Sequence, residues 1–426
     1  MLSFDTTLSA VALATLLGKA AALPHFGHTE LSRRTYPSGS GKQATTITLA
    51  APLGGQFYTV NVTIGGQPQV VLLDTGSSDL WIHSKNVTCI DVNTGNPSGK
   101  EACAFGPGGY DPATSSTYQP LPFENNFNAT YAGGAAFGVG ATDTLVIGDL
   151  LVPNVTFAIA EFAAFDGGAG YAIDGVMGLA SPLLTMLFNG RDGSKNNASD
   201  ESRHLYEPWF YQAVEEGLIE PYFSLALDRT PPESQKANSN TTFLGSFTIG
   251  GIPDISVKDK SIVIHNPNFT VPIQDTEVLV KYFSATNVTF SFPGSTSLGE
   301  NATSPIALLD SGTTNIIAPS AVAKAFNGAI VPSPMSNETM GSYIVQCNAS
   351  IPDFSVTIEG VEFPLQKEDL VFYNSVLPEG FCISSIAPPL KGQEGISILG
   401  NRFLVNVIST YNVKTDGIIL SERQRS

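Results

Sequence analysis

The sequence has 426 residues, of which 42% are hydrophobic and 14% charged, and its formal net charge is −17. This composition is globular rather than disordered, and the length fits two domains of about 200 residues each. The negative charge argues against nucleic acid and anionic membranes as partners, whereas 38 acidic against 21 basic residues would suit an acidic medium.

Residues 1–22 predict a secretory signal peptide. Residues 8–17 form an apolar core, and Ala20, Ala21 and Ala22 supply the small residues that a signal peptidase requires, although Asp5 precedes the core and no basic residue does. A buried N-terminal helix is the alternative. Residues 23–45 are polar, and Arg33-Arg34 within them marks either a cleavage site that removes a short pro-segment or an exposed linker.

Many Asn-x-Ser/Thr acceptors also indicate secretion. Two of them, Asn61 and Asn128, lie in strand-like patterns, which argues against their use. The charged C-terminus carries no hydrophobic tail for a lipid anchor, so we expect a released, extracellular protein without a membrane anchor. The remaining candidate glycosylation sites are Asn86, Asn154, Asn197, Asn240, Asn268, Asn287, Asn301, Asn337 and Asn348.

Strand patterns begin near residue 46 and continue to an aspartate-containing loop. Residues 56–64 alternate between apolar and polar, and Gly65-Gly66 predicts a hairpin turn. The apolar residues 70–73 then lead into Asp74-Thr75-Gly76-Ser77-Ser78. This order places an aspartate where a buried strand ends and a tight, glycine-containing loop begins.

Four cysteines allow three pairings. Pairing Cys89 with Cys103 and Cys347 with Cys382 keeps each bridge within one half of the chain. A secreted protein would form them as disulfides. Zinc is the rival interpretation, but the spacings of 14 and 35 residues match no zinc-ligand pattern, and we expect no metal.

Helical patterns are scarce. Residues 205–216 form one, with Trp209, Phe210 and Val214 on one face and Gly217 as a stop, and residues 320–326 form another. After residues 223–227 the sequence turns polar and proline-bearing, so we place an N-terminal lobe at 46–228 and a C-terminal lobe at 229–426.

A second aspartate loop lies 236 residues after the first. The apolar residues 306–309 precede Asp310-Ser311-Gly312-Thr313-Thr314, and each half then contains an apolar-apolar-Gly element, at 176–179 and at 398–401. Such an element lets a strand pack closely beneath the loop, because glycine has no Cβ. Two aspartates held together cannot both ionise cheaply, so one shared proton would give a general base beside a general acid.

On these motifs the chain resembles pepsin-type aspartic proteases, most of all the secreted fungal members. The resemblance covers nearly all of residues 56–420, and its most specific strings are at 74–81, 110–112, 115–118, 174–180 and 398–403. It implies an all-β, bilobal fold of two barrel-like lobes with the active cleft between them.

The resemblance also assigns roles to individual residues. Asp74 and Asp310 would be the catalytic pair, Ser77 and Thr313 would steady their outer oxygens, and Thr75 and Ser311 would lock the two loops together, with Ser in place of the commoner Thr at 311. Residues 130–134 match the flap that closes over substrate. The residues assigned to the flap and to substrate binding are Tyr131, Trp81, Gly76, Gly133 and Gly312.

The chain departs from the family pattern in three places. Ala132 follows the flap tyrosine where the family usually has Gly, the pro-segment is short, and the loop from Cys89 to Cys103 is longer than in pepsin. Asp174 and Asp143 match structural positions of the family, and nothing in the sequence ties Asp79, Glu124 or Asp143 to a substrate pocket.

We therefore predict a secreted aspartic endopeptidase with a zymogen form. It would hydrolyse proteins and peptides at acidic pH, need no cofactor, be monomeric and be inhibited by pepstatin. A non-catalytic binding protein of the same fold is the alternative, but both aspartates, their neighbouring hydroxyls and Tyr131 are present. A glycosidase with two carboxylates is disfavoured, because the chain has only two tryptophans for a sugar site.

Overall fold

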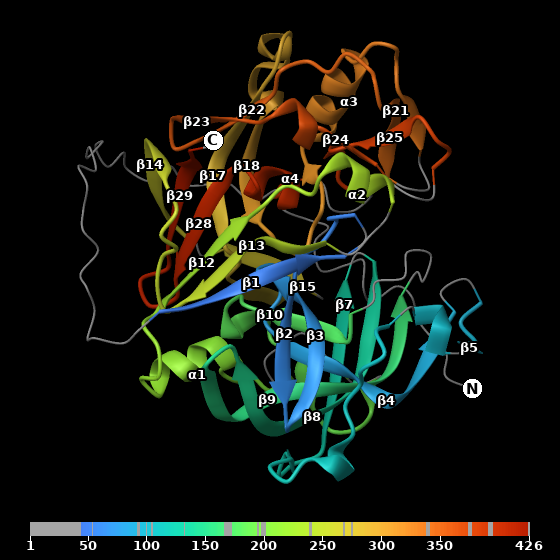
Figure 1. Cartoon of the computed structure of the whole chain (residues 1–426), viewed down its shortest axis with the longest axis vertical. Coiled ribbons are helices and arrows are strands. Elements are labelled where there is room, and N and C mark those ends of the chain that lie inside the picture. Colours follow the sequence, from blue (N-terminus) through green and yellow to red (C-terminus); the bar gives the residue numbers. More distant parts are fainter. Residues whose placement is uncertain are drawn as a thin grey trace.

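The computed structural model describes residues 44–424 apart from 53, 92–93, 99, 104, 132, 166–172, 194–195, 197–201, 238–240, 267–268, 274–275, 338–340, 374–376 and 391–394. The predicted signal peptide, nearly all of the predicted pro-segment, Ala132 and the acceptors Asn197, Asn240 and Asn268 lie outside the described residues. The fold is all-β and bilobal, as predicted, with the first half of the chain in one lobe and most of the second half in the other (Figure 1).

The first lobe consists of strands from one long sheet. Two short strands, β5 (Pro97–Ser98) and β6 (Gln119–Pro120), pair with β4 and β8 of that sheet. From the outer edge inward its strands are β11 (Leu187–Asn189), β7 (Asn125–Tyr131), β8 (Gly134–Ile147), β9 (Leu150–Phe165), β4 (Leu80–Ile90), β10 (Gly175–Gly178), β3 (Gln67–Asp74) and β2 (Thr59–Ile64).

The same sheet continues through strands from both halves of the chain and so joins the lobes. The first strand of the described chain pairs with one from beyond the predicted lobe boundary, and the last two strands follow them. In order these strands are β1 (Thr45–Ala51), β13 (Thr241–Ile249), β12 (Tyr222–Leu227), β28 (Val407–Asn412), β29 (Gly417–Arg423) and β14 (Val257–His265).

The second lobe has two further sheets and a separate hairpin, β15 (Phe269–Ile273) with β16 (Thr276–Val280). Its larger sheet runs β23 (Val361–Pro364), β22 (Ser355–Ile358), β17 (Ser284–Ser291), β18 (Thr303–Leu309), β27 (Ile396–Leu399), β19 (Ile316–Ile317) and β26 (Ile386–Ala387). The smaller one runs β20 (Met335–Asn337), β21 (Ser342–Gln346), β25 (Phe381–Ser384) and β24 (Val371–Tyr373).

The α-helices of the described residues are short: α1 (Trp209–Glu215), α2 (Pro232–Lys236), α3 (Ser320–Gly328) and α4 (Asn401–Leu404). The predicted helix at 320–326 is confirmed within α3. The helix predicted at 205–216 begins later, because Pro208 precedes it with an extended ψ of 157°. Its buried face carries Ala213 beside Trp209 and Phe210, whereas Val214 is only half-buried.

The predicted hairpin turn is confirmed between β2 and β3. Gly65 and Gly66 have φ of 55° and 79°, which glycine adopts without strain. The strand pattern predicted from residue 56 starts at Thr59 as β2, and Asn61 within it points outward.

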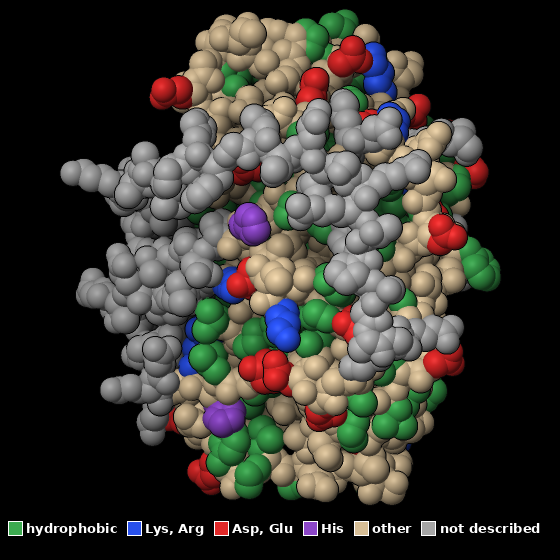
Figure 2. All heavy atoms as spheres, turned by 90° about the vertical axis from the view of Figure 1, so that its left-hand side faces the viewer, with side chains coloured by type: hydrophobic (Ala, Val, Ile, Leu, Met, Phe, Trp, Pro, Cys, Tyr) green, Lys and Arg blue, Asp and Glu red, His purple; other side chains and the backbone are tan. Residues whose placement is uncertain are grey.

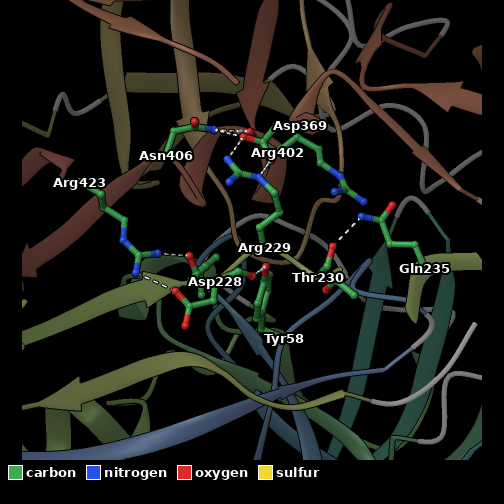
Figure 3. A network of polar contacts seen from close by, with 10 residues as sticks. Tyr58, Asp228, Arg229, Thr230, Gln235, Asp369, Arg402, Asn406 and Arg423 are labelled. Atoms are coloured by element: carbon green, nitrogen blue, oxygen red, sulfur yellow. Dashed lines mark hydrogen bonds and ion pairs between the residues drawn. The ribbon is translucent and has the colours of Figure 1, made fainter. Parts of the chain in front are cut away.

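A polar network lies between the lobes (Figure 3). The Asp369 carboxylate is fully buried and accepts both Nε–H and Nη2–H of Arg229, while Asn406 Nδ2 donates to it at 2.9 Å. From the first lobe, the Tyr58 hydroxyl donates to the Asp228 carbonyl at 2.5 Å. The Tyr58 contact ties the residue before β2 to the segment that follows β12, next to the predicted lobe boundary at 228/229.

Both predicted disulfides are present, Cys89–Cys103 and Cys347–Cys382. The side chains of five candidate glycosylation sites are exposed, namely Asn86, Asn154, Asn287, Asn301 and Asn348, and Asn337 is half-buried. Acidic side chains are scattered over the face in Figure 2, with only small groups of basic ones among its described residues. None of the described helices has the length and apolar character to span a bilayer.

Candidate active site

The two predicted aspartates stand at equivalent places in the two lobes. β3 ends at Asp74, and β10 runs parallel to it with Gly178 opposite Asp74. β18 ends at Leu309, immediately before Asp310, and β27 runs parallel to it with Leu399 opposite Leu309. The predicted apolar-apolar-Gly elements therefore lie beside the aspartate strands, as the sequence indicated.

Each carboxylate is held by its own loop in the same way. The Gly76 N–H donates to Asp74 Oδ1 at 2.8 Å, and the Ser77 hydroxyl donates to Asp74 Oδ2. In the other lobe the Gly312 N–H donates to Asp310 Oδ1 at 2.8 Å and the Thr313 hydroxyl donates to Asp310 Oδ2 at 2.5 Å. Hydrogen bonds to ionised oxygens stabilise charge, so each loop can support a carboxylate.

The glycines bring the two loops together. A Cβ on Gly76 would lie 2.6 Å from Asp310 Oδ1, and a Cβ on Gly312 would lie 2.5 Å from Asp74 Oδ1. Real Cβ atoms essentially never approach that closely, so only glycine lets each loop approach the opposite carboxylate. Asp74 and Asp310, which lie 236 positions apart in the sequence, thus meet in one site.

Burial dominates the electrostatics of the pair. The Asp74 side chain is buried, which raises its pKa well above the ordinary 3.8, and the nearby charge of Asp310 raises it further. Hydrogen bonds from Ser77 and Gly76 act in the opposite direction. Because the raising effects are larger, the pair retains a proton where isolated aspartates would be fully ionised.

Thr75 and Ser311 lock the loops beneath the pair through four hydrogen bonds. The Thr75 hydroxyl donates to the Leu309 carbonyl at 2.8 Å and accepts from the Ser311 N–H at 2.9 Å. The Ser311 hydroxyl donates to the Leu73 carbonyl at 2.7 Å and accepts from the Thr75 N–H at 3.0 Å. Both side chains are buried, so this cross-link connects the lobes with almost no competition from water.

The predicted flap is the hairpin of β7 and β8. Tyr131 pairs with Gly134 at its tip, and Gly133 is exposed in the turn. Trp81 Nε1 donates to the Tyr131 hydroxyl at 2.8 Å. Burial holds the pKa of Tyr131 well above its ordinary value, so this hydroxyl stays protonated.

The sequence matches the eukaryotic aspartyl protease family over residues 57–423. The chain belongs to this family. It is 31% identical over 367 residues to an Aspergillus fumigatus protein named "Probable aspartic-type endopeptidase", covering 84% of this chain and 77% of that protein.

More distant relatives have the same character. A vacuolar aspartic protease of Candida albicans is 28% identical, covering 90% of this chain and 79% of its own, and human gastricsin is 27% identical, covering 84% and 79%. The crystal structure of an aspartic proteinase from Irpex lacteus superimposes with a TM-score of 0.65 at 17% identity, covering 90% of this chain and 98% of that one. The enzyme is thus an aspartic-type endopeptidase with a pepsin-like fold.

Other acidic residues of this aspartic endopeptidase lie away from the pair. Asp174 accepts from the backbone N–H groups of Val70 and Gly108, at 2.8 and 3.0 Å. Asp143 accepts from the hydroxyls of Tyr110 and Thr117. Burial acts to raise its pKa, but the hydrogen bonds it receives together outweigh burial and lower it. Both make the contacts of structural residues, which is the role that the family resemblance implied.

Two features of the site were not predicted from the sequence. Burial raises the pKa of Tyr282, just before β17, and the charges of Asp310 and Asp74 raise it further, so this tyrosine is within electrostatic reach of the pair. Asp79 is buried and accepts hydrogen bonds from the Met186 N–H and the Tyr206 hydroxyl. The only sequence signal for Asp79 was its place in the motif at 74–81, since neither partner belongs to a motif.

Proposed function

We propose that this aspartic endopeptidase hydrolyses peptide bonds at acidic pH with a water molecule activated between Asp74 and Asp310. One observation supports the assignment above all others: each carboxylate is held by equivalent donors of its own loop and is approached closely by the glycine of the opposite loop. The substrate would be an extended peptide lying across the cleft under the flap, held by backbone hydrogen bonds.

The chemistry requires one proton on the pair. The ionised aspartate takes a proton from the water while the water oxygen bonds to the scissile carbonyl carbon, and the protonated aspartate gives its proton to the carbonyl oxygen. The products of this step are a tetrahedral diol and a pair that again holds one proton. Ser77 and Thr313 would stabilise whichever carboxylate is charged, and Tyr131 would close over the substrate and exclude water.

This mechanism fixes the direction of the pH dependence. As pH rises past the upper apparent pKa of the pair, the shared proton is lost and the general acid disappears, so activity falls. Burial and the charge of Asp310 raise the pKa of Asp74, which extends the singly protonated state toward higher pH. The acidic limb is set by protonation of the second carboxylate.

The test is cleavage of a denatured protein substrate from pH 2 to 8, with and without pepstatin, by the wild type and by Asp310→Asn. We expect cleavage at acidic pH only, inhibited by pepstatin and reduced roughly 10²–10⁴-fold in the variant, as for loss of a positioned general acid or base. A correctly folded and fully processed wild type that cleaves nothing at any pH would instead favour a binding protein of this fold.

We also propose that the enzyme is secreted, processed from a zymogen and active as a monomer. Residues 1–22 have the pattern of a signal peptide, two disulfides suit an oxidising compartment, and five candidate glycosylation sites are exposed. Expression of the full chain with a C-terminal tag, followed by endoglycosidase treatment and N-terminal sequencing of the protein recovered from the medium, tests secretion and processing. Retention in a vacuolar fraction contradicts the extracellular location. A secreted protein whose N-terminus is residue 23 rules out removal of the pro-segment.

A further inference from the structure

The flap strand β7 does not form the edge of its sheet. β11 pairs with it in antiparallel register, with Leu187 opposite Phe127 and Asn189 opposite Asn125. One residue further on, the Asn128 N–H donates to the Met186 carbonyl at 3.1 Å. The residues that lead into the tip of the flap are therefore held by the short segment that begins at Met186.

That segment is in turn held from the loop of the first catalytic aspartate. The Met186 N–H lies 3.0 and 3.1 Å from the two carboxylate oxygens of Asp79, and the Tyr206 hydroxyl donates to one of them at 2.7 Å. Asp79 is 1% exposed and follows Asp74 by five residues. A single residue, Met186, thus connects the Asp79 carboxyl group to the flap strand through its N–H and its carbonyl.

We propose that Asp79 is a positioning residue, whose carboxyl group sets the place of the flap strand relative to the Asp74 loop through Met186. The inference rests on the proposed function, since it concerns how Tyr131 is placed over the same cleft. Its physical basis is that a buried acceptor with several donors is costly to remove, because the donors are then left without a partner. The flap strand is the element that would move when Met186 loses its acceptor.

The protonation state of Asp79 determines which variant preserves the contact. Burial raises the pKa of Asp79 to about 6, against the hydrogen bonds of Met186 and Tyr206 and the charge of Arg203, and Tyr131 is the other titratable group that interacts with it. Below that pH the carboxyl group is neutral and offers one carbonyl oxygen. An asparagine offers the same acceptor in the same shape, whereas an alanine offers none.

Hydrogen exchange at about pH 4 measures the link directly and needs no substrate. In Asp79→Ala we expect the amides of residues 125–131 to exchange at least 10-fold faster than in the wild type. Asp174→Ala is the matched control, because Asp174 is also buried and also accepts backbone N–H donors, but those of Val70 and Gly108 rather than that of Met186. The control should lower thermal stability and leave the exchange of residues 125–131 within about two-fold.

Activity supplies the second measurement. We expect kcat/KM at pH 4 to fall at least 10-fold in Asp79→Ala and to stay within two-fold of the wild type in Asp79→Asn. If Asp79→Ala does not fold, Met186→Pro replaces it: the substitution removes the N–H that Asp79 accepts together with the methionine side chain, and it keeps the carbonyl that accepts from Asn128. Thr185 has the extended ψ of 142° that suits a residue before proline.

The outcomes separate the two proposals. Unchanged exchange at residues 125–131 in a folded Asp79→Ala or Met186→Pro protein overturns the positioning role, whatever the activity. Unchanged kcat/KM together with faster exchange also overturns it, because the flap would then work without the link. Faster exchange in a chain whose wild type cleaves nothing leaves the link standing and contradicts the proposed function instead.

Discussion

The two aspartate loops are nearly equivalent at the carboxylates and differ a few residues later. In each, the backbone N–H two residues after the aspartate donates to Oδ1 at 2.8 Å. Five residues after the aspartates, however, the first loop has Asp79 and the second has Asn315. Asp79 holds Met186 and Tyr206, whereas Asn315 Oδ1 accepts no hydrogen bond from the described residues.

The strands that follow the two loops also differ, in their length and in their contact with the flap. β4 runs for 11 residues, and its second residue is Trp81, whose indole N–H donates to the hydroxyl of Tyr131 in the predicted flap. β19 has only two residues, and the second of them, Ile317, stands at the position equivalent to Trp81. The proposed proton-sharing chemistry needs two matched carboxylates, which would account for the likeness of the loops there. Closure over substrate needs only one flap, so we infer that only the first loop carries the residues that support it.

The largest expected effect tests the matched part. Gly76→Ala and Gly312→Ala each place a Cβ within 2.6 Å of the opposite carboxylate, so each pushes the pair apart. We expect both variants to lose about 100-fold or more in kcat/KM, as misplacement by about 1 Å can cause, with little loss in thermal stability. Steady-state kinetics beside a thermal melt checks this, and a loss in only one of the two would break the equivalence of the loops.

The two hydroxyls of the cross-link beneath the pair should contribute about equally to the free energy of unfolding. Thr75→Val and Ser311→Ala each remove a buried hydroxyl that donates one hydrogen bond and accepts another. We expect each to lower the free energy of unfolding by about 2–4 kcal/mol, since buried partners are left unsatisfied. Urea unfolding measures it. Ser311→Thr is the control, and a gain in stability there would mean that the missing methyl group leaves room.

A smaller effect concerns pH. Because the pKa of Asp74 is raised in the folded protein, its contribution to stability is fully present below pH 3.8 and is lost as pH rises through the raised value. Asp74→Asn removes that titration, so its unfolding free energy should fall less than that of the wild type between about pH 4 and 8. If the unfolding free energies of the two proteins changed with pH in parallel, the pKa of Asp74 would not be raised in the folded protein.

The sequence was sufficient for the parts of the site that repeat. Strand, aspartate and glycine recur in both halves, so the fold class, Asp74, Asp310 and the loop hydroxyls could be placed from the motifs together with the family resemblance. Cys89 and Cys103 could be paired because the bridge closes a local loop. These features share a local cause, which a sequence pattern records.

The missed parts depend on contacts between distant segments. Met186 and Tyr206 meet Asp79 across 107 and 127 residues, and no periodicity or motif announces either partner. The late start of α1 has a different, local cause, since Pro208 stands directly before the helix and interrupts an apolar pattern that extends further upstream. A side-chain hydrogen bond to a backbone segment that belongs to no motif cannot be predicted from a sequence pattern.

The smallest expected effect lies at the position that distinguishes the loops. Asn315→Ala removes a carboxamide whose oxygen accepts no hydrogen bond from the described residues, while the Asn315 carbonyl keeps the Gly400 N–H at 3.2 Å. We therefore expect kcat/KM within two-fold of the wild type and a stability change of about 0.5 kcal/mol or less, as for substitutions away from special contacts. The same substitution at Asp79 should cost at least 10-fold, so the ratio of the two losses measures how far the first loop has been specialised to hold the flap. Equal losses would mean that both positions only fill space beside their loops, and the asymmetry would then lie in β4 and Trp81 alone.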